Sequence, residues 1–257
     1  MRSNAMQIDR RDIIDGLGRG LKVMEAFDVA HPRLTPSEVA ERTQMTRTAA
    51  RRYLLSLVHF GYADSDGKRF WLQPRVLRLG QNFLGSARLP RLVQPVLQQI
   101  SQHLGENVNA SVLDDHDVIY LARSPSQRGQ AIGFPASTRV PAHLVTPGVV
   151  ILSTYPEEVR DAWIDEHLFT AQTPHTLTDP ARFREHVRTA GQLGYWITDQ
   201  QLEIGQCGLA VPVRDGRGDC HGALSLTFPS DSYSSRQILD QLLPSLQEAS
   251  LSLRALI

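Results

Sequence analysis

The stretch that decides the fold of this chain reads Thr46-Arg47-Thr48-Ala49-Ala50-Arg51-Arg52-Tyr53-Leu54-Leu55-Ser56-Leu57. Thr46 is a good helix N-cap, because its hydroxyl can accept a hydrogen bond from an amide of the first turn. At helical spacing one face is apolar and consists of Ala50, Tyr53, Leu54 and Leu57. The other face is polar and consists of Arg47, Thr48, Arg51 and Arg52. A helix with a basic N-terminal end suits a groove of DNA, although a basic face is more often only a solvated surface.

The residues before this stretch indicate a second helix. Thr35-Pro36-Ser37-Glu38 combines an N-cap, a proline at the first helical position and a glutamate three residues after the cap. We expect this helix to run to about Arg42 and Thr43-Gln44-Met45 to form a short turn. A further helix is predicted over Ile13–Ala30. Two short helices joined by such a turn, with a basic start on the second, predict a helix-turn-helix.

The residues after the stretch indicate a hairpin. Tyr62–Leu72 contains two short strand patterns around Asp66-Gly67, a favoured two-residue turn. Lys68 and Arg69 leave the turn, where they can meet phosphates. A hairpin after a helix-turn-helix is typical of a winged helix, and the alternative is a plain surface hairpin with two solvated charges.

The apolar periodicity of Pro74–Leu84 predicts a linker helix, which Ser86–Pro90 interrupts. We therefore expect a DNA-binding domain over residues 6–73, a linker helix over 74–87 and a second domain over 88–257. Ser3-Asn4-Ala5 before Met6 resembles the remnant of an expression tag, so residues 1–5 are set aside.

Charge is distributed unevenly along the 257 residues, although the formal net charge is zero. Residues 1–88 hold 15 Lys and Arg against 9 Asp and Glu (+6), and the remainder holds 12 against 18 (−6). This asymmetry favours a polyanionic partner for the N-terminal part. Cys207 and Cys220 make neither a disulfide framework nor a CxxC metal site. The start is polar and no apolar run approaches about 18 residues, so we expect a cytoplasmic protein that does not enter a membrane.

The C-terminal part alternates helix and strand patterns. Helices are expected at Leu92–Leu104, Val149–Thr154, Glu157–His167, Pro180–Leu193 and Tyr233–Leu256, and strands at Asn107–Leu113, Val118–Arg123, Ala131–Phe134, Tyr195–Thr198, Gly208–Arg214 and Gly222–Phe228. Helices that flank antiparallel strands predict an α+β domain of the kind that senses small molecules.

Pro141–Gly148 leads directly into one of these helices. A glycine just before a helix exposes free amides that can bind an anion such as a carboxylate, although any loop-to-helix junction has the same pattern. Phe134, Tyr195 and Trp196 can contact an aromatic ring, but aromatic residues in strands are usually core. Arg123 and Arg139 can pair with an acid; we assign both to the surface.

An enzyme is the alternative reading of this domain, with His143, Asp199, Glu203 and Cys207 as candidate catalytic residues. A nucleophile needs a base within hydrogen-bond reach and a group that orients the base. The chain shows no Ser/His/Asp spacing, HExxH motif or phosphate loop. Cys207 is better explained as a small buried residue, and His143 as pocket wall or packing, since no second ligand stands at metal-binding spacing. We expect no catalysis, no cofactor and no metal.

In the order of its motifs and the residues that form them, the chain resembles the IclR family of bacterial transcription regulators over nearly its whole length. The supporting motifs are Arg19-Gly20-Leu21, Leu34–Ala40, Thr46–Leu57, Leu72–Gly80, Ala110–Leu113, Thr138–Ala142, Glu203-x-Gly205 and Ala210–Arg214. Within that family, Thr46–Leu55 resembles the subgroup of β-ketoadipate pathway regulators that respond to protocatechuate or 4-hydroxybenzoate.

The resemblance implies a winged helix-turn-helix, a linker helix and a GAF-like effector domain. It also implies homodimers or dimers of dimers on palindromic operators, and a small organic acid as effector. Three departures are evident: Pro147 has no amide proton, Val149 stands where many members have lysine, and Gly208 stands where some have a pocket cysteine. The resemblance therefore leaves the precise effector open.

These observations and the resemblance define two candidate sites. The DNA-binding set is Arg19, Thr35, Thr46, Arg47, Thr48, Arg51, Arg52, Lys68 and Arg69, and the effector-binding set is Phe134, His143, Thr146, Pro147, Gly148, Thr198, Asp199, Glu203, Ser225 and Thr227. We expect an effector-responsive regulator of aromatic catabolism. The competing readings are a DNA-binding regulator without effector and the enzyme.

Overall fold

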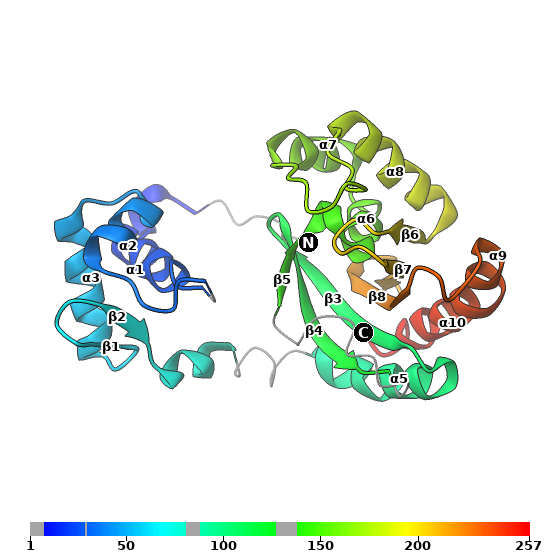
Figure 1. Ribbon diagram of the computed structural model, residues 1–257, viewed down its shortest axis with the longest axis horizontal. Helices are drawn as coiled ribbons and strands as arrows, with labels where there is room; N and C mark the ends of the chain where they lie inside the picture. The colour runs from blue at the N-terminus through cyan, green and yellow to red at the C-terminus, as the bar shows by residue number, and fades with distance from the viewer. Residues whose placement is uncertain (1–7, 29, 81–87, 127–137) are drawn as a thin grey trace. The chain divides into compact units, whose positions relative to one another are not determined.

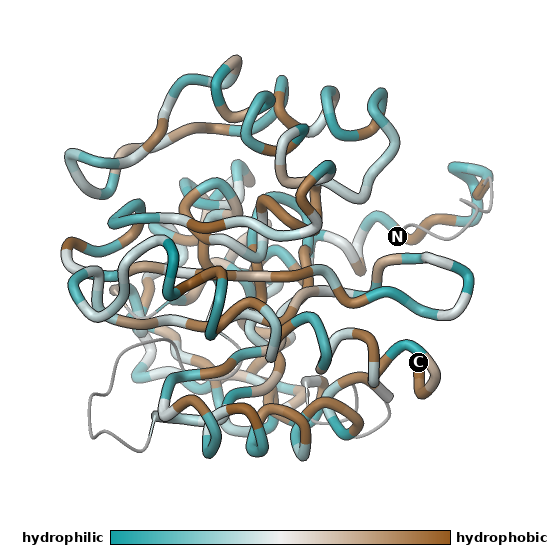
Figure 2. The backbone as a smooth tube through the Cα atoms, turned by 90° about the vertical axis from the view of Figure 1, so that its right-hand side faces the viewer, coloured by the Kyte–Doolittle hydropathy of each residue, from teal (hydrophilic) through white to brown (hydrophobic). Residues whose placement is uncertain are grey.

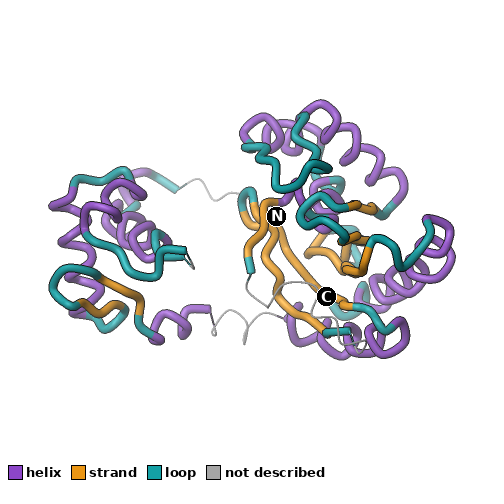
Figure 3. The backbone as a smooth tube through the Cα atoms, viewed as in Figure 1, coloured by secondary structure: helices purple, strands orange, loops and turns teal. Residues whose placement is uncertain are grey.

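The computed structural model describes residues 8–28, 30–80, 88–126 and 138–257. The chain divides into two compact units near Ser86, and each is described by itself. Figures 1 and 3 show a small, mostly helical N-terminal unit and a larger C-terminal unit built around a sheet. This mixed helix-and-sheet organisation is the α+β fold that the sequence predicts.

The N-terminal unit contains a helix-turn-helix and a two-stranded hairpin. Its elements are a 3-10 turn at Arg10–Asp12, α1 (Asp15–Glu25), α2 (Pro36–Thr43), α3 (Arg47–His59), β1 (Ala63–Ser65) and β2 (Phe70–Leu72). The strands pair antiparallel, and Leu34 adds an isolated bridge to Phe70. Between α2 and α3, the chain turns at Gln44, which has a positive φ of 55°. The predicted helix-turn-helix and wing are therefore present.

Both predicted helix caps form. The Thr35 hydroxyl accepts a hydrogen bond from the Glu38 amide while the Glu38 carboxylate accepts one from the Thr35 amide, which is a capping box. The Thr46 hydroxyl accepts a hydrogen bond from the Ala49 amide. One core holds the unit together, because the apolar residues of all three helices meet those of the hairpin; its buried members are Val23, Ala26, Leu34, Val39, Ala40, Ala50, Leu54, Leu57, Ala63 and Phe70.

Three local expectations need correction in this unit. The helix predicted over Ile13–Ala30 spans only Asp15–Glu25. The first strand ends at Ser65 and the second begins at Phe70, so the hairpin loop has four residues and not two. The Asp66 carboxylate accepts hydrogen bonds from the backbone amides of Lys68 and Arg69 and stabilises this wider loop. The predicted linker begins as a 3-10 turn at Pro74–Val76 and is helical over residues 77–80; its remainder lies outside the described residues.

The C-terminal unit contains one six-stranded antiparallel sheet with helices on both faces. Its elements are α5 (Arg88–Leu104), β3 (Asn107–Asp114), β4 (Asp117–Ser124), β5 (Arg139–Pro141), a 3-10 turn η3 (Ala142–Leu144), α6 (Thr146–Leu152), α7 (Glu157–Glu166), α8 (Pro180–Leu193), β6 (Trp196–Asp199), β7 (Gln206–Arg214), β8 (Cys220–Pro229), α9 (Ser235–Gln237), a π-helical turn (Ile238–Leu242) and α10 (Leu243–Leu253). The strand order is β5-β4-β3-β8-β7-β6.

The two faces of the sheet have different coverings. Helices α5 and α10 pack on one face through a large apolar core to which β3, β7 and β8 contribute alternate residues. On the other face α6 packs against β7 and β8, and α7 and α8 pack on α6. Figure 2 shows hydrophobic and hydrophilic residues alternating along the helices, as this arrangement requires.

Several boundaries in this unit differ from those predicted. Helix α6 begins at Thr146, three residues before the predicted start, because Pro147 occupies the first turn. The predicted terminal helix is interrupted by the π-helical turn at Ile238–Leu242. The strand predicted over Ala131–Phe134 lies outside the described residues, and β5 was not predicted. Across the described ranges, no helix is long and apolar enough to cross a membrane.

Candidate DNA-binding surface and effector pocket

Helix α3 presents the basic surface that its sequence predicts. Ala50, Leu54 and Leu57 are buried in the unit's core. The side chains on the opposite face are exposed to solvent; they are Arg47, Thr48, Arg51 and Arg52. A capped helix with an exposed basic N-terminal half behind a short turn has the geometry of a recognition helix.

The remaining candidates for DNA contact are of two kinds, exposed basic residues and helix-capping threonines. Arg19 on α1 and the hairpin-loop residues Lys68 and Arg69 are exposed and leave their charges in solvent. Thr35 and Thr46 are helix caps, so their hydroxyls already accept amide hydrogen bonds. Each hydroxyl keeps its proton, which can be donated to a phosphate oxygen.

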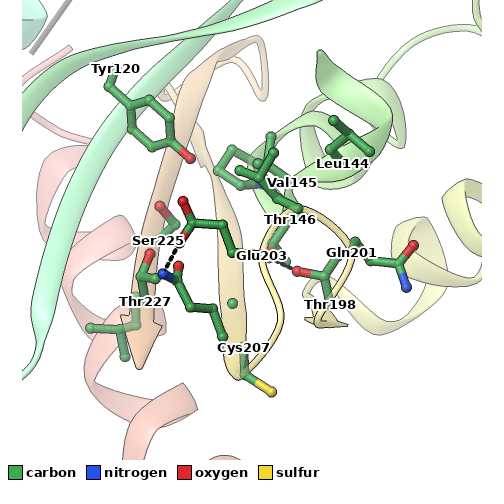
Figure 4. Close-up of a pocket in the computed structure, with 15 residues that line it drawn as sticks. Tyr120, Leu144, Val145, Thr146, Thr198, Gln201, Glu203, Cys207, Ser225 and Thr227 are labelled. Carbon is green, nitrogen blue, oxygen red and sulfur yellow. Dashed lines mark hydrogen bonds between the residues drawn. The ribbon is translucent and has the colours of Figure 1, made fainter. Parts of the chain in front are cut away.

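The C-terminal unit contains a pocket between the α6 side of the sheet and the loop after β6. It encloses about 400 Å³ of empty space, its open mouth included. The lining residues are Tyr120, Leu144, Val145, Thr146, Pro147, Thr198, Gln201, Leu202, Glu203, Gln206, Cys207, Gly208, Ser225, Leu226 and Thr227 (Figure 4). Apolar surface from η3 and the start of α6 therefore faces hydroxyl and amide groups from the strands.

Strand register explains which residues form the pocket floor. Thr198 pairs with Gly208, which pairs with Thr227 on β8. Ser225 lies two residues before Thr227 and therefore on the same face of the sheet. Figure 4 shows the Ser225 and Thr227 side chains on one strand beside Tyr120, whose hydroxyl points toward the pocket. Burial raises the pKa of Tyr120 above its ordinary value, so this hydroxyl keeps its proton at neutral pH.

A threonine pair closes one wall of the pocket. The Thr146 and Thr198 hydroxyl oxygens are 2.7 Å apart and share a hydrogen bond. A Cβ atom on Gly208 would lie 2.3 Å from the Thr146 oxygen and 3.1 Å from the Thr198 oxygen. The missing side chain at position 208 therefore provides the space that these two hydroxyls occupy.

The loop between β6 and β7 covers the mouth of the pocket. Gln200 and Gly205 both have positive φ values, of 53° and 80°, and turn the chain back over the sheet. Glu203 reaches between Tyr120 and Ser225, and its carboxylate accepts a hydrogen bond from the side-chain amide of Gln206 (Figure 4). A negative charge thus lies beside Ser225 within the pocket.

Six of the ten residues predicted for effector binding line this pocket. They are Thr146, Pro147, Thr198, Glu203, Ser225 and Thr227. Gly148 does not line it, because it lies in the first turn of α6, where its amide donates to the Val145 carbonyl and an added Cβ would lie 2.0 Å from the Ala142 oxygen. Phe134 lies outside the described residues.

His143 and Asp199 also lie away from the pocket lining. Buried His143 is hydrogen-bonded through one ring nitrogen to the Thr170 carbonyl and through the other to His167, at 3.0 and 2.7 Å. Asp199 accepts a hydrogen bond from the Cys207 thiol at 3.1 Å. Burial, together with this hydrogen bond and charge, raises the pKa of Cys207 to about 12. The thiol stays protonated at neutral pH and is a poor nucleophile.

Two arginines that the sequence assigns to the surface differ in their environment. Arg139 is half exposed and forms ion pairs with Asp114 and Asp117, as expected for a surface residue. Arg123 is partly buried on β4 and donates to the Asn107 side-chain oxygen at 2.8 Å. Arg123 is therefore only partly exposed, and Asn107 holds its side chain.

Sequence reasoning missed several pocket residues, including Tyr120, Gln201 and Leu202. Alternation along Val118–Arg123 predicts that Tyr120 shares a face with Val118, but not that this face borders a cavity. Gln201 and Leu202 belong to a loop that has no periodic pattern. Over the described residues, no group of three or more His, Cys, Asp or Glu side chains is placed to hold a metal ion.

Comparison with known proteins assigns both units. The family model described as "Bacterial transcriptional regulator IclR C-terminal" matches residues 81–255, and that described as "IclR helix-turn-helix domain" matches residues 16–67. The p-hydroxybenzoate hydroxylase transcriptional activator of Acinetobacter baylyi is 37% identical over 256 residues, which cover 98% of this chain and 94% of the relative.

Two solved structures of similar proteins contain aromatic acids. The double mutant of the PobR inducer-binding domain from Acinetobacter, in complex with 3-hydroxybenzoic acid, is 30% identical, with 66% of this chain and 100% of that chain covered and a TM-score of 0.62. An IclR homologue from Microbacterium hydrocarbonoxydans complexed with 4-hydroxybenzoate is 26% identical, with 93% and 97% covered and a TM-score of 0.71.

These matches cover both the DNA-binding unit and the unit with the pocket. They exclude the enzyme reading, since the matching families are regulators of transcription. The helix-turn-helix implies double-stranded DNA as a partner. The chain belongs to the IclR family of DNA-binding bacterial transcriptional regulators.

Proposed function

We propose that this regulator controls genes of aromatic-compound catabolism and that a small aromatic acid of the hydroxybenzoate class is its effector. The observation that carries the proposal is the pocket on the α6 side of the sheet, where apolar walls face hydroxyl and amide groups. A flat apolar ring with polar substituents needs this combination. The names of the relatives support the same class of ligand.

The DNA-binding unit reads the operator through α3. Arg47, Thr48, Arg51 and Arg52 face the major groove, where an arginine that binds guanine through two hydrogen bonds discriminates by about 1–3 kcal/mol. Lys68 and Arg69 of the wing contact phosphates, as do the hydroxyls of Thr35 and Thr46, and Arg19 reaches a neighbouring groove. The protein is a homodimer or a dimer of dimers on a palindromic operator in the cytoplasm, with half-sites about one DNA turn or a multiple apart.

The segment 74–87 connects the DNA-binding domain (6–73) to the effector domain (88–257) and transmits the signal. Effector binding changes the geometry of the protomers in the oligomer and therefore the spacing of the recognition helices. This requires that the effector binds one geometry more tightly than the other.

A regulator without effector is the competing function. A thermal-shift panel of aromatic acids separates the two, because a ligand that binds only the folded protein raises its melting temperature. We expect hydroxybenzoates to raise it. No shift with any aromatic acid would favour a C-terminal domain that serves only for assembly.

The DNA-binding surface is tested by mobility shift on the DNA upstream of the protein's own gene. Arg51→Ala with Arg52→Ala should weaken specific binding about tenfold to a hundredfold for each arginine that binds a base, since these side chains are exposed and the helix keeps its core. A matched control, Arg182→Ala with Arg188→Ala, removes two exposed charges from the effector domain and should not change binding. Unchanged affinity and sequence preference in the α3 variant would refute the recognition-helix assignment.

A further inference from the structure

The sheet beside the pocket contains buried polar side chains without hydrogen-bond partners. Both polar atoms of Asn109 are buried and make no hydrogen bond, and the same holds for the hydroxyls of Ser111 and Ser225. Asn109 and Ser111 are 0% exposed, and Ser225 is 1% exposed. Burial of an amide or hydroxyl without a partner is costly, and native proteins seldom tolerate it without a functional reason.

These orphaned groups lie together beside the pocket. Asn109 on β3 pairs in register with Ser225 on β8, and directly paired residues have Cβ atoms about 4.5–5.5 Å apart on one face of a sheet. Ser225 lines the pocket. Ser111 lies two residues along β3 from Asn109 and therefore on the same face. Asn109 and Ser111 thus lie on the pocket face of the sheet, on β3 between the lining residues Ser225 of β8 and Tyr120 of β4.

The chemistry of this inner region favours an uncharged group that both donates and accepts hydrogen bonds. A carboxamide and two hydroxyls provide donors and acceptors but no charge. A carboxylate, which only accepts, would leave the Asn109 oxygen unpaired. A carboxylate next to Ser225 would also face the negative charge of Glu203, which reaches toward the same residue (Figure 4). A hydroxyl suffers neither penalty.

We propose that Asn109 and Ser225 form a subsite for the phenolic hydroxyl of the effector, and that Asn109 determines specificity for hydroxylated over unsubstituted aromatic acids. This inference rests on the proposed hydroxybenzoate class of ligand. The hydroxyl donates to one of the orphaned oxygens and accepts from the amide or serine beside it, so the buried groups gain partners only in the complex. The carboxylate of the ligand is directed to the rest of the pocket.

Calorimetric titration of the intact protein with 3-hydroxybenzoate, 4-hydroxybenzoate and benzoate tests the subsite. The wild type should prefer at least one hydroxybenzoate to benzoate by about tenfold or more, because a site built to pair a hydroxyl rejects the analogue that lacks it. Asn109→Leu should weaken binding of that hydroxybenzoate about tenfold and leave benzoate within about twofold. Ser225→Ala should act in the same direction, and Ser252→Ala on α10 is the matched control.

The melting temperature of the ligand-free protein provides a second readout. Asn109→Leu replaces an unpaired buried amide by an apolar group of similar size, so the melting temperature should stay the same or rise. A residue with only a structural role would instead lower it. Equal losses for benzoate and hydroxybenzoate, or no loss for either, would overturn the subsite while leaving the proposed effector class intact. Absence of binding of all three acids to the wild type would overturn both.

Discussion

Gly208 decides how closely β7 approaches the threonine pair at the pocket wall. The 2.3 Å between its hypothetical Cβ and the Thr146 oxygen is far below any tolerated contact. The hydroxyls of Thr146 and Thr198 fill the space beside this glycine. Residues 146, 198 and 208 therefore form one packing unit, and a change at one position depends on the other two.

Gly208→Ala should destabilise the effector domain by about 1–3 kcal/mol, the usual cost of overpacking a buried site. Adding Thr146→Ala should recover part of this loss, since it removes the atom that the new Cβ meets. Urea denaturation of the two single variants and the double variant measures the coupling. Strictly additive losses would contradict the proposed steric unit. Gly216→Ala is a suitable control, because a Cβ there meets nothing within 4 Å.

A chain of three histidines links separate elements behind the pocket wall. His167, just after α7, is hydrogen-bonded to His116 at the β3–β4 turn at 3.0 Å and to His143 of η3 at 2.7 Å. Trp163 stacks on His167 with ring centroids 4.4 Å apart. Burial, and then the charges that His143 and His116 would carry, lower the pKa of His167 to about 4. His167 is therefore neutral at pH 7, and η3, which contains His143, also contributes the pocket residue Leu144 and continues into Val145.

Stability should fall as the pH drops from about 6.5 toward 4. The unfolded chain binds a proton at His167 near the ordinary pKa of about 6.5, whereas the folded chain resists it until about 4, so acid favours the unfolded state. The loss should be below about 1.4 kcal/mol per pH unit. Melting temperatures between pH 7.5 and 5 measure it. His167→Gln should flatten the profile, and His103→Gln, at an exposed position, should leave it unchanged; a reversed result would disprove this role.

At the level of elements, local signals predict what local chemistry decides. The caps at Thr35, Thr46 and Asp179 form as their side chains dictate, and Gly194 ends α8 with a positive φ of 74°. The hairpin loop was predicted too short because the Asp66 carboxylate competes for two loop amides. The terminal helix was predicted unbroken because periodicity cannot distinguish a π-helical turn from the surrounding α-helix.

Six pocket residues were predictable from the family resemblance and the sequence motifs; they are Thr146 and Pro147 at the start of α6, Glu203 in the β6–β7 loop, and Thr198, Ser225 and Thr227 on strands. Ser225, Thr227 and Thr198 face the pocket because register places them on one side of the sheet. His143 was assigned to effector binding or packing, and its partners Thr170 and His167 are more than 20 residues away in sequence. No sequence pattern encodes such contacts, or the orphaned state of Asn109.

In the whole molecule, DNA binding belongs to the N-terminal unit, and the pocket belongs to the C-terminal unit. The sequence assigns the excess positive charge to the DNA-binding part, with +6 over residues 1–88 and −6 over the remainder. The effector domain therefore adds little general attraction to DNA, and salt-dependent binding arises from the N-terminal unit. The effector domain instead contributes the pocket, so regulation requires that occupancy of the pocket changes the free energy of operator binding.

Such coupling is reciprocal. If the hydroxybenzoate changes the Kd for operator DNA by some factor, the operator must change the Kd for the hydroxybenzoate by the same factor, which is typically about 5- to 150-fold. Calorimetric titration of the acid into free and operator-bound protein measures one factor, and mobility shift with and without acid measures the other. A hydroxybenzoate that binds in the pocket but changes operator affinity less than twofold would contradict the proposed coupling. The same acid should leave binding to unrelated DNA unchanged, because phosphate contacts alone do not depend on the spacing of the recognition helices in the proposed dimer.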